Sequence, residues 1–318
     1  EARLVESGRR GLVAASVLAS ASVALLVAAF LTRDYSIAYV WQHSGGATPP
    51  AYLLSCLWAG QEGSLLFWGW LLALWSAAAC TVATRPDHDL MAWVGAVLAA
   101  ILAFFLWLCV FVANPFVRLD VVPADGNGLN PLLAHPGMAL HPPFLYLGFT
   151  GLAVPYAFGI AALLSRRTDA AWLLASRRWT LAAWCFLTIG LALGARWAYD
   201  VLGWGGYWGW DPVENAALMP WIAATALLHS AVVQERRGLF GVWNMALLIL
   251  TFGLVVLGTF LTRAGLVSSV HSFARSEIGP AFLLFTGAVL LGGFWLLWLR
   301  LDDLRTNGRV EAALSREG

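Results

Sequence analysis

Long apolar runs recur along the whole chain, and they constrain its fold more than any other feature. A helix needs about 20 residues to cross a bilayer, and eight runs of about that length lie at about 11–31, 63–84, 90–112, 143–164, 179–198, 216–234, 240–262 and 280–300. Because lipid offers backbone groups no hydrogen-bond partner, only helices or closed barrels can cross it. We therefore predict an all-α, polytopic membrane protein with about eight transmembrane helices and short connecting loops.

The composition indicates the same class. The chain has 318 residues, of which 60% are hydrophobic and 12% are charged, whereas soluble domains carry about 25% charged residues. No soluble domain of useful size is visible, so we treat residues 1–318 as one transmembrane domain. The chain begins at Glu1, without Met or a signal-peptide pattern, and we expect it to be part of a longer polypeptide.

The distribution of charge predicts an orientation. The net charge is only +1, and it indicates no nucleic-acid partner. All 19 basic residues are arginines, of which 14 fall on one side of the predicted membrane. The positive-inside rule places that side in the cytoplasm. The outer loops, at about 32–62, 113–142, 199–215 and 263–279, are rich in proline and glycine, which predicts turns and short helices there.

The outer loop between the fifth and sixth predicted spans reads GWGGYWGWDPVEN. Tryptophan and tyrosine gather at membrane–water interfaces, so an aromatic belt is one interpretation. A belt needs no glycines, however, whereas glycines let a backbone turn sharply and approach a ligand. We therefore favour a platform for a planar ligand, with flat faces supplied by Trp204, Tyr207, Trp208 and Trp210.

Asp211, in the same loop, has two roles that the sequence leaves open. Together with Glu214 it can cap the start of the next span, where Pro212 suits the first helical turn. Alternatively, its carboxylate can face the ligand of the aromatic platform.

Three of the six histidines are candidate iron ligands. His229 falls deep in the sixth predicted span, where an ionisable side chain is costly and marks a functional site by default; it can ligate haem iron or hydrogen-bond across a helix pair. His141, just before the fourth span, and His271, in the last outer loop, share the face of the aromatic platform. Each alone can be a capping or surface residue, but together they can hold one haem from its two axial sides. We expect His43 and His135 to be surface residues.

Several segments resemble one family. The block GWGGYWGWDPVENAALMPWIAATALLHS resembles the tryptophan-rich WWD signature of membrane proteins that handle haem in cytochrome c biogenesis, and more narrowly that of the CcmF-type haem lyases. GQEGSLLFW, LNPLLAHPGMALHPPFLYLGF and GTFLTRAGLVSSVHSFA are similar to CcmF segments in the same order. One departure is Tyr207, where the family often has tryptophan. The resemblance covers essentially the whole chain.

The resemblance implies a role for each candidate residue. His141 and His271 match the two outer histidines that ligate the incoming haem, while the WWD loop grips its ring. His229 matches one axial ligand of a resident haem b, whose second ligand lies outside this chain. Arg196 and Arg263, at the outer ends of predicted spans, can pair with haem propionates or act as simple interfacial anchors.

The resemblance also implies partners and a reaction. Haem would arrive on a chaperone of CcmE type, and apocytochrome c would arrive through thioreduction partners of CcmH type. The thiols of its C-x-x-C-H motif would then form thioethers with the haem on the periplasmic side of the inner membrane, with quinol as a source of electrons for haem reduction. Two alternatives remain open from the sequence: a haem transporter or exporter, and a docking scaffold without catalytic activity.

Overall fold

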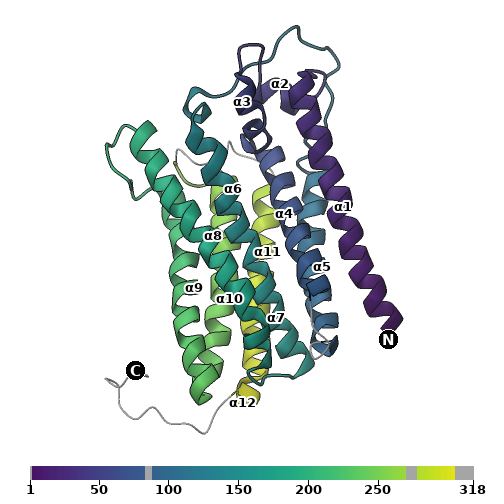
Figure 1. The fold of residues 1–318 in the computed structure, drawn as a ribbon, viewed down its shortest axis with the longest axis vertical. Helices are drawn as coiled ribbons and strands as arrows, with labels where there is room; N and C mark the ends of the chain where they lie inside the picture. The colour runs from purple at the N-terminus through teal and green to yellow at the C-terminus, as the bar shows by residue number, and fades with distance from the viewer. Residues whose placement is uncertain (1, 83–87, 270–277, 305–318) are drawn as a thin grey trace.

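The computed structural model describes residues 2–82, 88–269 and 278–304. Eight helices in these ranges are long and apolar enough to cross a membrane, and they stand side by side in a bundle (Figure 1). The predicted all-α, polytopic class is therefore confirmed. The spans are α1 (Ala2–Thr32), α4 (Gln61–Val82), α5 (His88–Phe111), α6 and α7 (Pro136–Gly151 and Ala153–Ser165) as one interrupted span, α8 (Ala171–Val201), α9 (Pro212–Arg237), α10 (Gly241–Arg263) and α11 (Ile278–Leu299).

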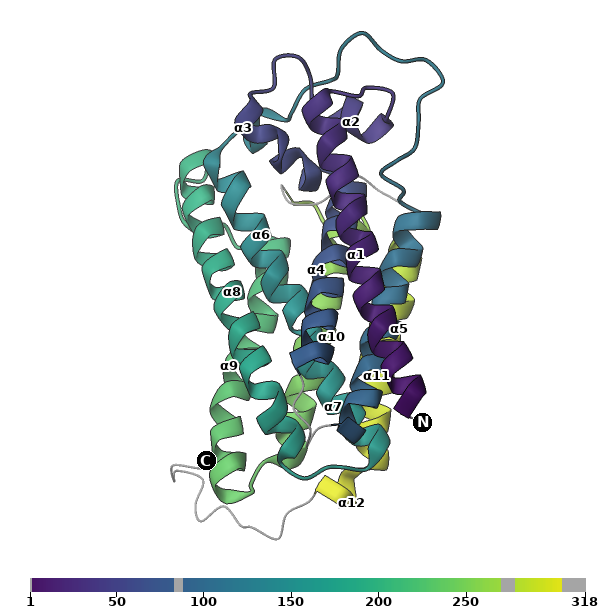
Figure 2. The ribbon, with the colours of Figure 1, turned by 45° about the vertical axis from the view of Figure 1, so that its right-hand side comes forward.

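The helices alternate in direction, so sequence neighbours are antiparallel, and the connections that follow α1, α5 and α8 lie at one end of the bundle (Figure 2). We call this the loop end. Helix α6 packs most extensively on α8, and α10 packs on both α9 and α11. Helix α4 contacts α1, α5 and α6. The side chains between them are almost all apolar, and the fully buried large ones include Trp68, Phe105 and Phe252.

The fourth span begins earlier than predicted. We expected it at about 143, but α6 begins at Pro136, with the His135 side chain accepting a hydrogen bond from the Gly137 amide as its N-cap. His141 therefore lies inside a helix and not in the loop before it. The prediction was wrong because Pro142 and Pro143 resemble a helix boundary, whereas α6 carries both in its interior.

One of the two interior prolines of α6, Pro142, is compensated by a neighbouring side chain. Pro142 has no amide hydrogen for the Met138 carbonyl four residues earlier. The Trp58 indole nitrogen donates to that carbonyl instead, at 2.9 Å. The span then breaks at Leu152, between Gly151 and α7, where Pro155 deprives another carbonyl of its helical partner.

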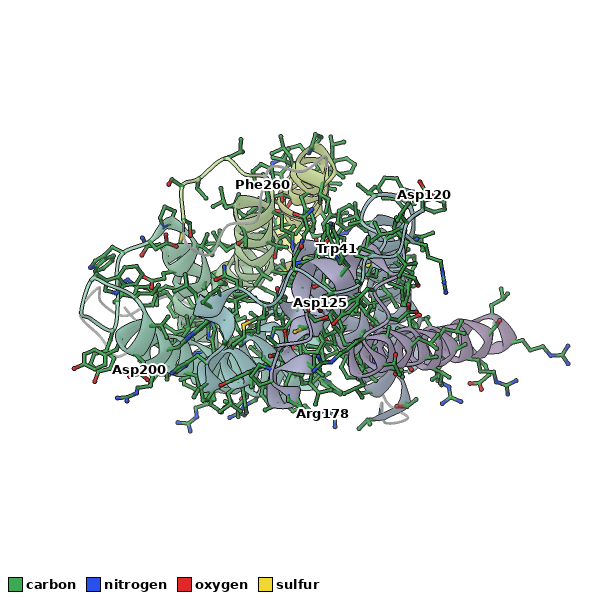
Figure 3. The ribbon with its side chains drawn as sticks, turned by 90° about the horizontal axis from the view of Figure 1, so that it is seen from above. Trp41, Asp120, Asp125, Arg178, Asp200 and Phe260 are labelled. Atoms are coloured by element: carbon green, nitrogen blue, oxygen red, sulfur yellow. The ribbon has the colours of Figure 1, made fainter. Side chains whose placement is uncertain are left out.

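Short helices and turns form the loop end, as predicted: α2 (Ala38–His43), α3 (Pro50–Leu53), η1 (Ser55–Trp58) and η3 (Pro131–Leu133). The loop after α5 crosses over them and is fastened by Asp125, which lies centrally when the loop end is viewed from above (Figure 3). Its carboxylate accepts hydrogen bonds from the amides of Gly46 and Gly126. These amides lower the pKa of Asp125 below its ordinary value.

Candidate functional site

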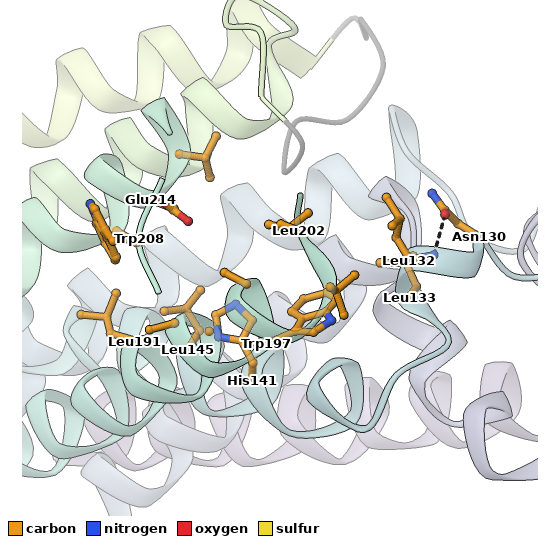
Figure 4. A pocket seen from close by; sticks show the side chains of 16 residues that line it. Asn130, Leu132, Leu133, His141, Leu145, Leu191, Trp197, Leu202, Trp208 and Glu214 are labelled. Atoms are coloured by element: carbon orange, nitrogen blue, oxygen red, sulfur yellow. Dashed lines mark hydrogen bonds between the residues drawn. The ribbon is translucent and has the colours of Figure 1, made fainter. Parts of the chain in front are cut away.

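A cleft opens at the loop end between α6, α8 and α9 (Figure 4). Its cavity volume is about 120 Å³, smaller than the roughly 300–1,000 Å³ that is usual for ligand sites. Most lining side chains are apolar. The lining residues with polar atoms in their side chains are Asn130, His141, Trp197, Trp208 and Glu214.

His141 is held from α8. Its Nδ1 lies 2.7 Å from the backbone oxygen of Gly190. Because a carbonyl can only accept, Nδ1 carries the hydrogen and the ring lone pair is on Nε2. Ring nitrogens that bind metals are usually prepared in this way, by a hydrogen bond from the other nitrogen. The ring of Trp197 lies beside the imidazole, with centroids 5.8 Å apart.

The four aromatic side chains of the loop between α8 and α9 differ in their exposure to solvent. Trp208 lines the cleft. Trp204, Tyr207 and Trp210 are 40%, 54% and 73% exposed and do not line it. They extend over the outer surface of the loop, and Tyr207 stacks on Tyr199 with centroids 4.6 Å apart. Of the four side chains predicted to form a planar platform, the structure therefore places only Trp208 in the cleft.

Two glycines and one strained residue shape this loop. A Cβ on Gly209 would lie 2.8 Å from the Trp204 ring, so only glycine allows this close packing. Gly205 has a φ of +66°, which is easy for glycine. Trp210 has a φ of +55°, which is rare for a bulky residue; the Asn215 amide donates to its carbonyl at 3.1 Å.

Asp211 is the N-cap of α9. Its carboxylate accepts from the amides of Val213 and Glu214, while Glu214 accepts from the Asp211 amide, so the two residues form a capping box. The Ser269 hydroxyl donates to the same Asp211 carboxylate at 2.6 Å. Asp211 does not line the cleft. The structure thus favours capping over a ligand-facing role, and it is Glu214 that lies at the cleft wall.

His229 lies on α9 far from the cleft. It is twelve residues beyond Ala217, which lines the cleft, and twelve residues of helix span about 18 Å. The side chain is exposed at the surface of the described bundle, and Nδ1 lies 2.8 Å from the Thr225 carbonyl oxygen. His229 therefore has the same tautomer as His141, with the lone pair on Nε2. It does not share a site with His141 in this chain.

The two predicted arginines have protein partners. Arg196 forms a salt bridge with Asp200 at 3.0 Å and is largely exposed. Arg263 ends α10 but turns inward and is only 2% exposed, so it is not an interfacial anchor. Its guanidinium donates to Ser64 and to the Gln61 carbonyl, and contact with a haem propionate would require it to leave them. Neither arginine lines the cleft.

Three of the remaining histidines, His43, His135 and His271, differ from one another. His271 lies outside the described residues. His135 caps α6 and is not an isolated surface residue. His43 is half-buried at the end of α2, with its ring 4.3 Å from that of Tyr39, and burial lowers its pKa; the prediction of a surface role was wrong because the ring packs against Gly60, just before α4.

Several cleft residues were missed by sequence reasoning. Trp197 lies in an apolar run beside Arg196 and had no distinguishing motif, and Asn130 lies in a long loop. The indole nitrogens of Trp197 and Trp208 are buried without a hydrogen-bond partner among the described residues. A spacing pattern could have indicated Trp197, because it lies at the same helical face as Gly190 and Gly194.

Comparison with known proteins identifies the family. The profile described as Cytochrome C assembly protein matches residues 58–268, which include the cleft residues and the WWD loop. The chain belongs to the cytochrome c assembly protein family. Within the family it is of CcmF type: it is 46% identical over 301 residues to the cytochrome c-type biogenesis protein ccl1 of Rhodobacter capsulatus, covering 94% of this chain and 46% of that protein.

Further relatives agree. The cytochrome c-type biogenesis protein CcmF of Escherichia coli is 42% identical over 319 residues, covering 100% of this chain and 49% of that protein. A solved structure named Cytochrome c Heme Lyase CcmF matches with a TM-score of 0.78 and 39% identity, covering 94% of this chain and 46% of that one. The chain therefore spans about half the length of the CcmF-type relatives that it matches.

Proposed function

We propose that this chain forms the haem-handling half of a haem lyase that serves cytochrome c maturation. The observation that carries the proposal is the cleft itself, where an imidazole prepared for metal binding faces an apolar, tryptophan-lined wall. The CcmF-type relatives, named for cytochrome c biogenesis and haem lyase activity, support it.

The donor set of the cleft suits a metal that arrives inside a macrocycle. The described residues contain no group of three or more His, Cys, Asp or Glu side chains that could hold a bare metal ion. A single histidine supplies one of the two axial ligands that a porphyrin leaves open on its iron. The unpartnered indole N–H groups of Trp197 and Trp208 would be satisfied by an acceptor-bearing ligand such as a propionate.

His271 is the proposed second axial ligand. Ser269, the last described residue of its loop, is tied to Asp211 at the start of α9, beside the cleft. Opposed imidazoles would need nitrogens about 4 Å apart, with each about 2 Å from iron.

The chain's share of the reaction is positioning. The aromatic loop, with Trp208 inside the cleft and Trp204, Tyr207 and Trp210 outside it, would hold the ring of the substrate haem delivered by a chaperone of CcmE type. Apocytochrome c, brought by partners of CcmH type, would present its two thiols. Each thiol adds across one vinyl group: sulfur bonds to the inner carbon, the proton passes to the terminal carbon, and no net electron is exchanged.

His229 is proposed to supply one axial ligand of a resident haem b. Its Nε2 lone pair and its outward position on α9 fit a ligand whose partner comes from outside this chain. Such a haem would supply electron-transfer chemistry that keeps iron ferrous, with quinol as the proposed donor. Thr225 fixes the ring orientation that this role needs.

The loop end is proposed to face the periplasm, across the inner membrane. Helix direction places Arg166, Arg167, Arg236 and Arg237 at the opposite end of the bundle, where the positive-inside rule puts the cytoplasm. By this proposal, thioether formation would take place at the loop end, on the periplasmic side of the membrane.

The test compares two histidines of α6 in the full-length protein. We expect His141→Ala to abolish detectable thioether-linked cytochrome c, because the substrate haem loses an axial ligand. His135→Ala is the matched control: it removes an N-cap, at a cost of about 1 kcal/mol of stability, and should leave maturation largely intact. Normal maturation with His141→Ala would overturn the proposal.

A second assay separates the lyase from the transporter alternative. Haem flux into sealed vesicles that contain the full-length protein should be no greater than in vesicles without it. Flux that depends on His141 and His229 would favour transport. A protein that never acquires haem absorbance from loaded chaperone would favour a docking scaffold.

A further inference from the structure

The face of α8 that holds His141 carries two glycines one helical turn apart. Gly190 and Gly194 are separated by three residues, in the sequence GLALG, a spacing that lets membrane helices approach closely. Helix α6 packs against this face. The two glycines have different neighbours: the atoms nearest to a Cβ at Gly190 belong to Leu145 of α6, mainly its backbone, and the three nearest to a Cβ at Gly194 all belong to the imidazole of His141.

The space at Gly194 is filled by the histidine ring. A Cβ there would lie 2.6 Å from Cε1 and 2.7 Å from Nδ1 of His141, and the three nearest atoms all belong to that ring. Ordinary carbon contacts are about 3.5–4.0 Å, so an alanine would displace the ring by about 1 Å. The ring is the end of a rotatable side chain, and the helices need not separate to admit the methyl group.

At Gly190 an added Cβ would meet backbone atoms instead of a rotatable side chain. A Cβ there would lie 2.7 Å from the backbone nitrogen of Leu145 and 2.8 Å from its Cα. An alanine at this position must therefore push α6 away from α8. The Gly190 carbonyl accepts the hydrogen bond from Nδ1 of His141. The close approach of α6 and α8 therefore also brings this acceptor to the ring.

We propose that Gly190 and Gly194 are positioning residues for haem ligation: Gly190 fixes the tautomer of His141, and the bare backbone at Gly194 fixes where its Nε2 points. This rests on the proposed function, since it concerns the same histidine. It adds that ligand strength at His141 is set by α8, a helix that contributes no ligand from this face. Loss of such an outer partner costs about 10–100-fold in metal affinity.

The central experiment is Gly194→Ala in the full-length protein. We expect haem bound at the cleft to be about 10–100-fold weaker, with the spectrum of a haem that has lost one axial imidazole. Free imidazole should restore the wild-type spectrum, as it should for His141→Ala. A variant that is merely misfolded would gain nothing from imidazole.

Two other glycines provide controls. Gly287→Ala, on α11, adds a methyl group where no atom lies within 4 Å, and it should leave haem binding unchanged. Gly190→Ala should lower the thermal stability of the protein, because its clash is with backbone. Equal effects of Gly194→Ala and Gly287→Ala would overturn the proposal.

A readout without haem distinguishes this inference from the proposed function. Nitrogen NMR of ¹⁵N-histidine-labelled protein, with the His141 signal assigned by its loss in His141→Ala, reports which ring nitrogen carries the hydrogen. We expect a single Nδ1–H form in the wild type and a mixture in Gly194→Ala, because the displaced ring loses its hydrogen bond to the Gly190 carbonyl. If that change is seen but the wild type binds no haem, the positioning holds and the lyase proposal fails. If haem binds through His141 and Gly194→Ala changes neither signal, the positioning alone is wrong.

Discussion

A histidine ligates iron through a nitrogen whose lone pair is available, and the neighbouring carbonyls decide which nitrogen that is. Gly190 does this for His141 from another helix, whereas Thr225 does it for His229 from the preceding turn of the same helix. The first arrangement depends on tertiary packing and the second on helix geometry alone. Variants that loosen α6 from α8 should therefore affect His141 and spare His229.

Asp211 gives a residue-scale prediction about capping. Replacing Asp211 with Ala should cost about 0.5–2 kcal/mol of unfolding free energy, because the amides of Val213 and Glu214 lose their acceptor. Asp211→Ser retains a capping oxygen and should restore most of the stability and nearly normal maturation. The measurements are detergent unfolding and the yield of haem-linked cytochrome. A serine variant that is stable but inactive would show that the carboxylate faces the ligand after all.

At this scale the sequence could predict residue types but not their surroundings. His141 and His229 stand out because ionisable groups are costly in lipid, and Asp211 because it precedes Pro212 at a helix start.

Arg263 was misplaced, since only tertiary structure brings Ser64 and Tyr146 within reach of its guanidinium. Trp197 was missed for the same reason, because only the packing of α6, far away in sequence, places His141 beside its ring.

At the scale of elements, α8 and α9 are joined by a reciprocal pair of hydrogen bonds. The Trp184 indole donates to Thr225, and the Trp221 indole donates to Thr188, each at 2.8 Å. The two rings stack at 6.0 Å. We call the two hydrogen bonds and the stacked rings the brace. It lies between the cleft and His229 along α9, and it joins two helices whose side chains line the cleft.

The brace predicts energetic coupling. Trp184→Phe should cost about 0.6 kcal/mol of unfolding free energy, and at most about 1.7, as is usual for hydrogen bonds between membrane helices. Because the rings stack, Trp184→Phe and Trp221→Phe together should differ from the sum of the single variants. Trp243→Phe is the control, since this side chain on α10 is 55% exposed. Additive effects would mean that the two pairs act independently.

Helix existence was easier to predict than helix ends. The apolar runs place all eight spans, because each run must bury its backbone in helix to cross lipid. The ends depend on capping and on tertiary compensation, as at Pro142, whose unmatched carbonyl is taken up by Trp58 from another segment. This is why α6 extends to Pro136 and carries His141 within it.

At the scale of the whole molecule, the bundle separates two histidine sites by depth. The cleft with His141 lies at the loop end, and His229 lies about 18 Å further along α9. The cleft is lined by described residues of this chain and is open at the loop end, and His229 is exposed on the described surface. Since the chain spans about half of its CcmF-type relatives, we expect the remaining half to complete the His229 site and to leave the cleft accessible.

The central claim is that a substrate haem lies in the cleft with its iron on His141. Cryo-electron microscopy of the full-length protein captured with haem-loaded chaperone tests it most directly. We expect porphyrin density between α6, α8 and the aromatic loop, with iron about 2 Å from Nε2 of His141. Porphyrin density elsewhere, or an imidazole of His141 that remains turned away from the iron, would contradict the account.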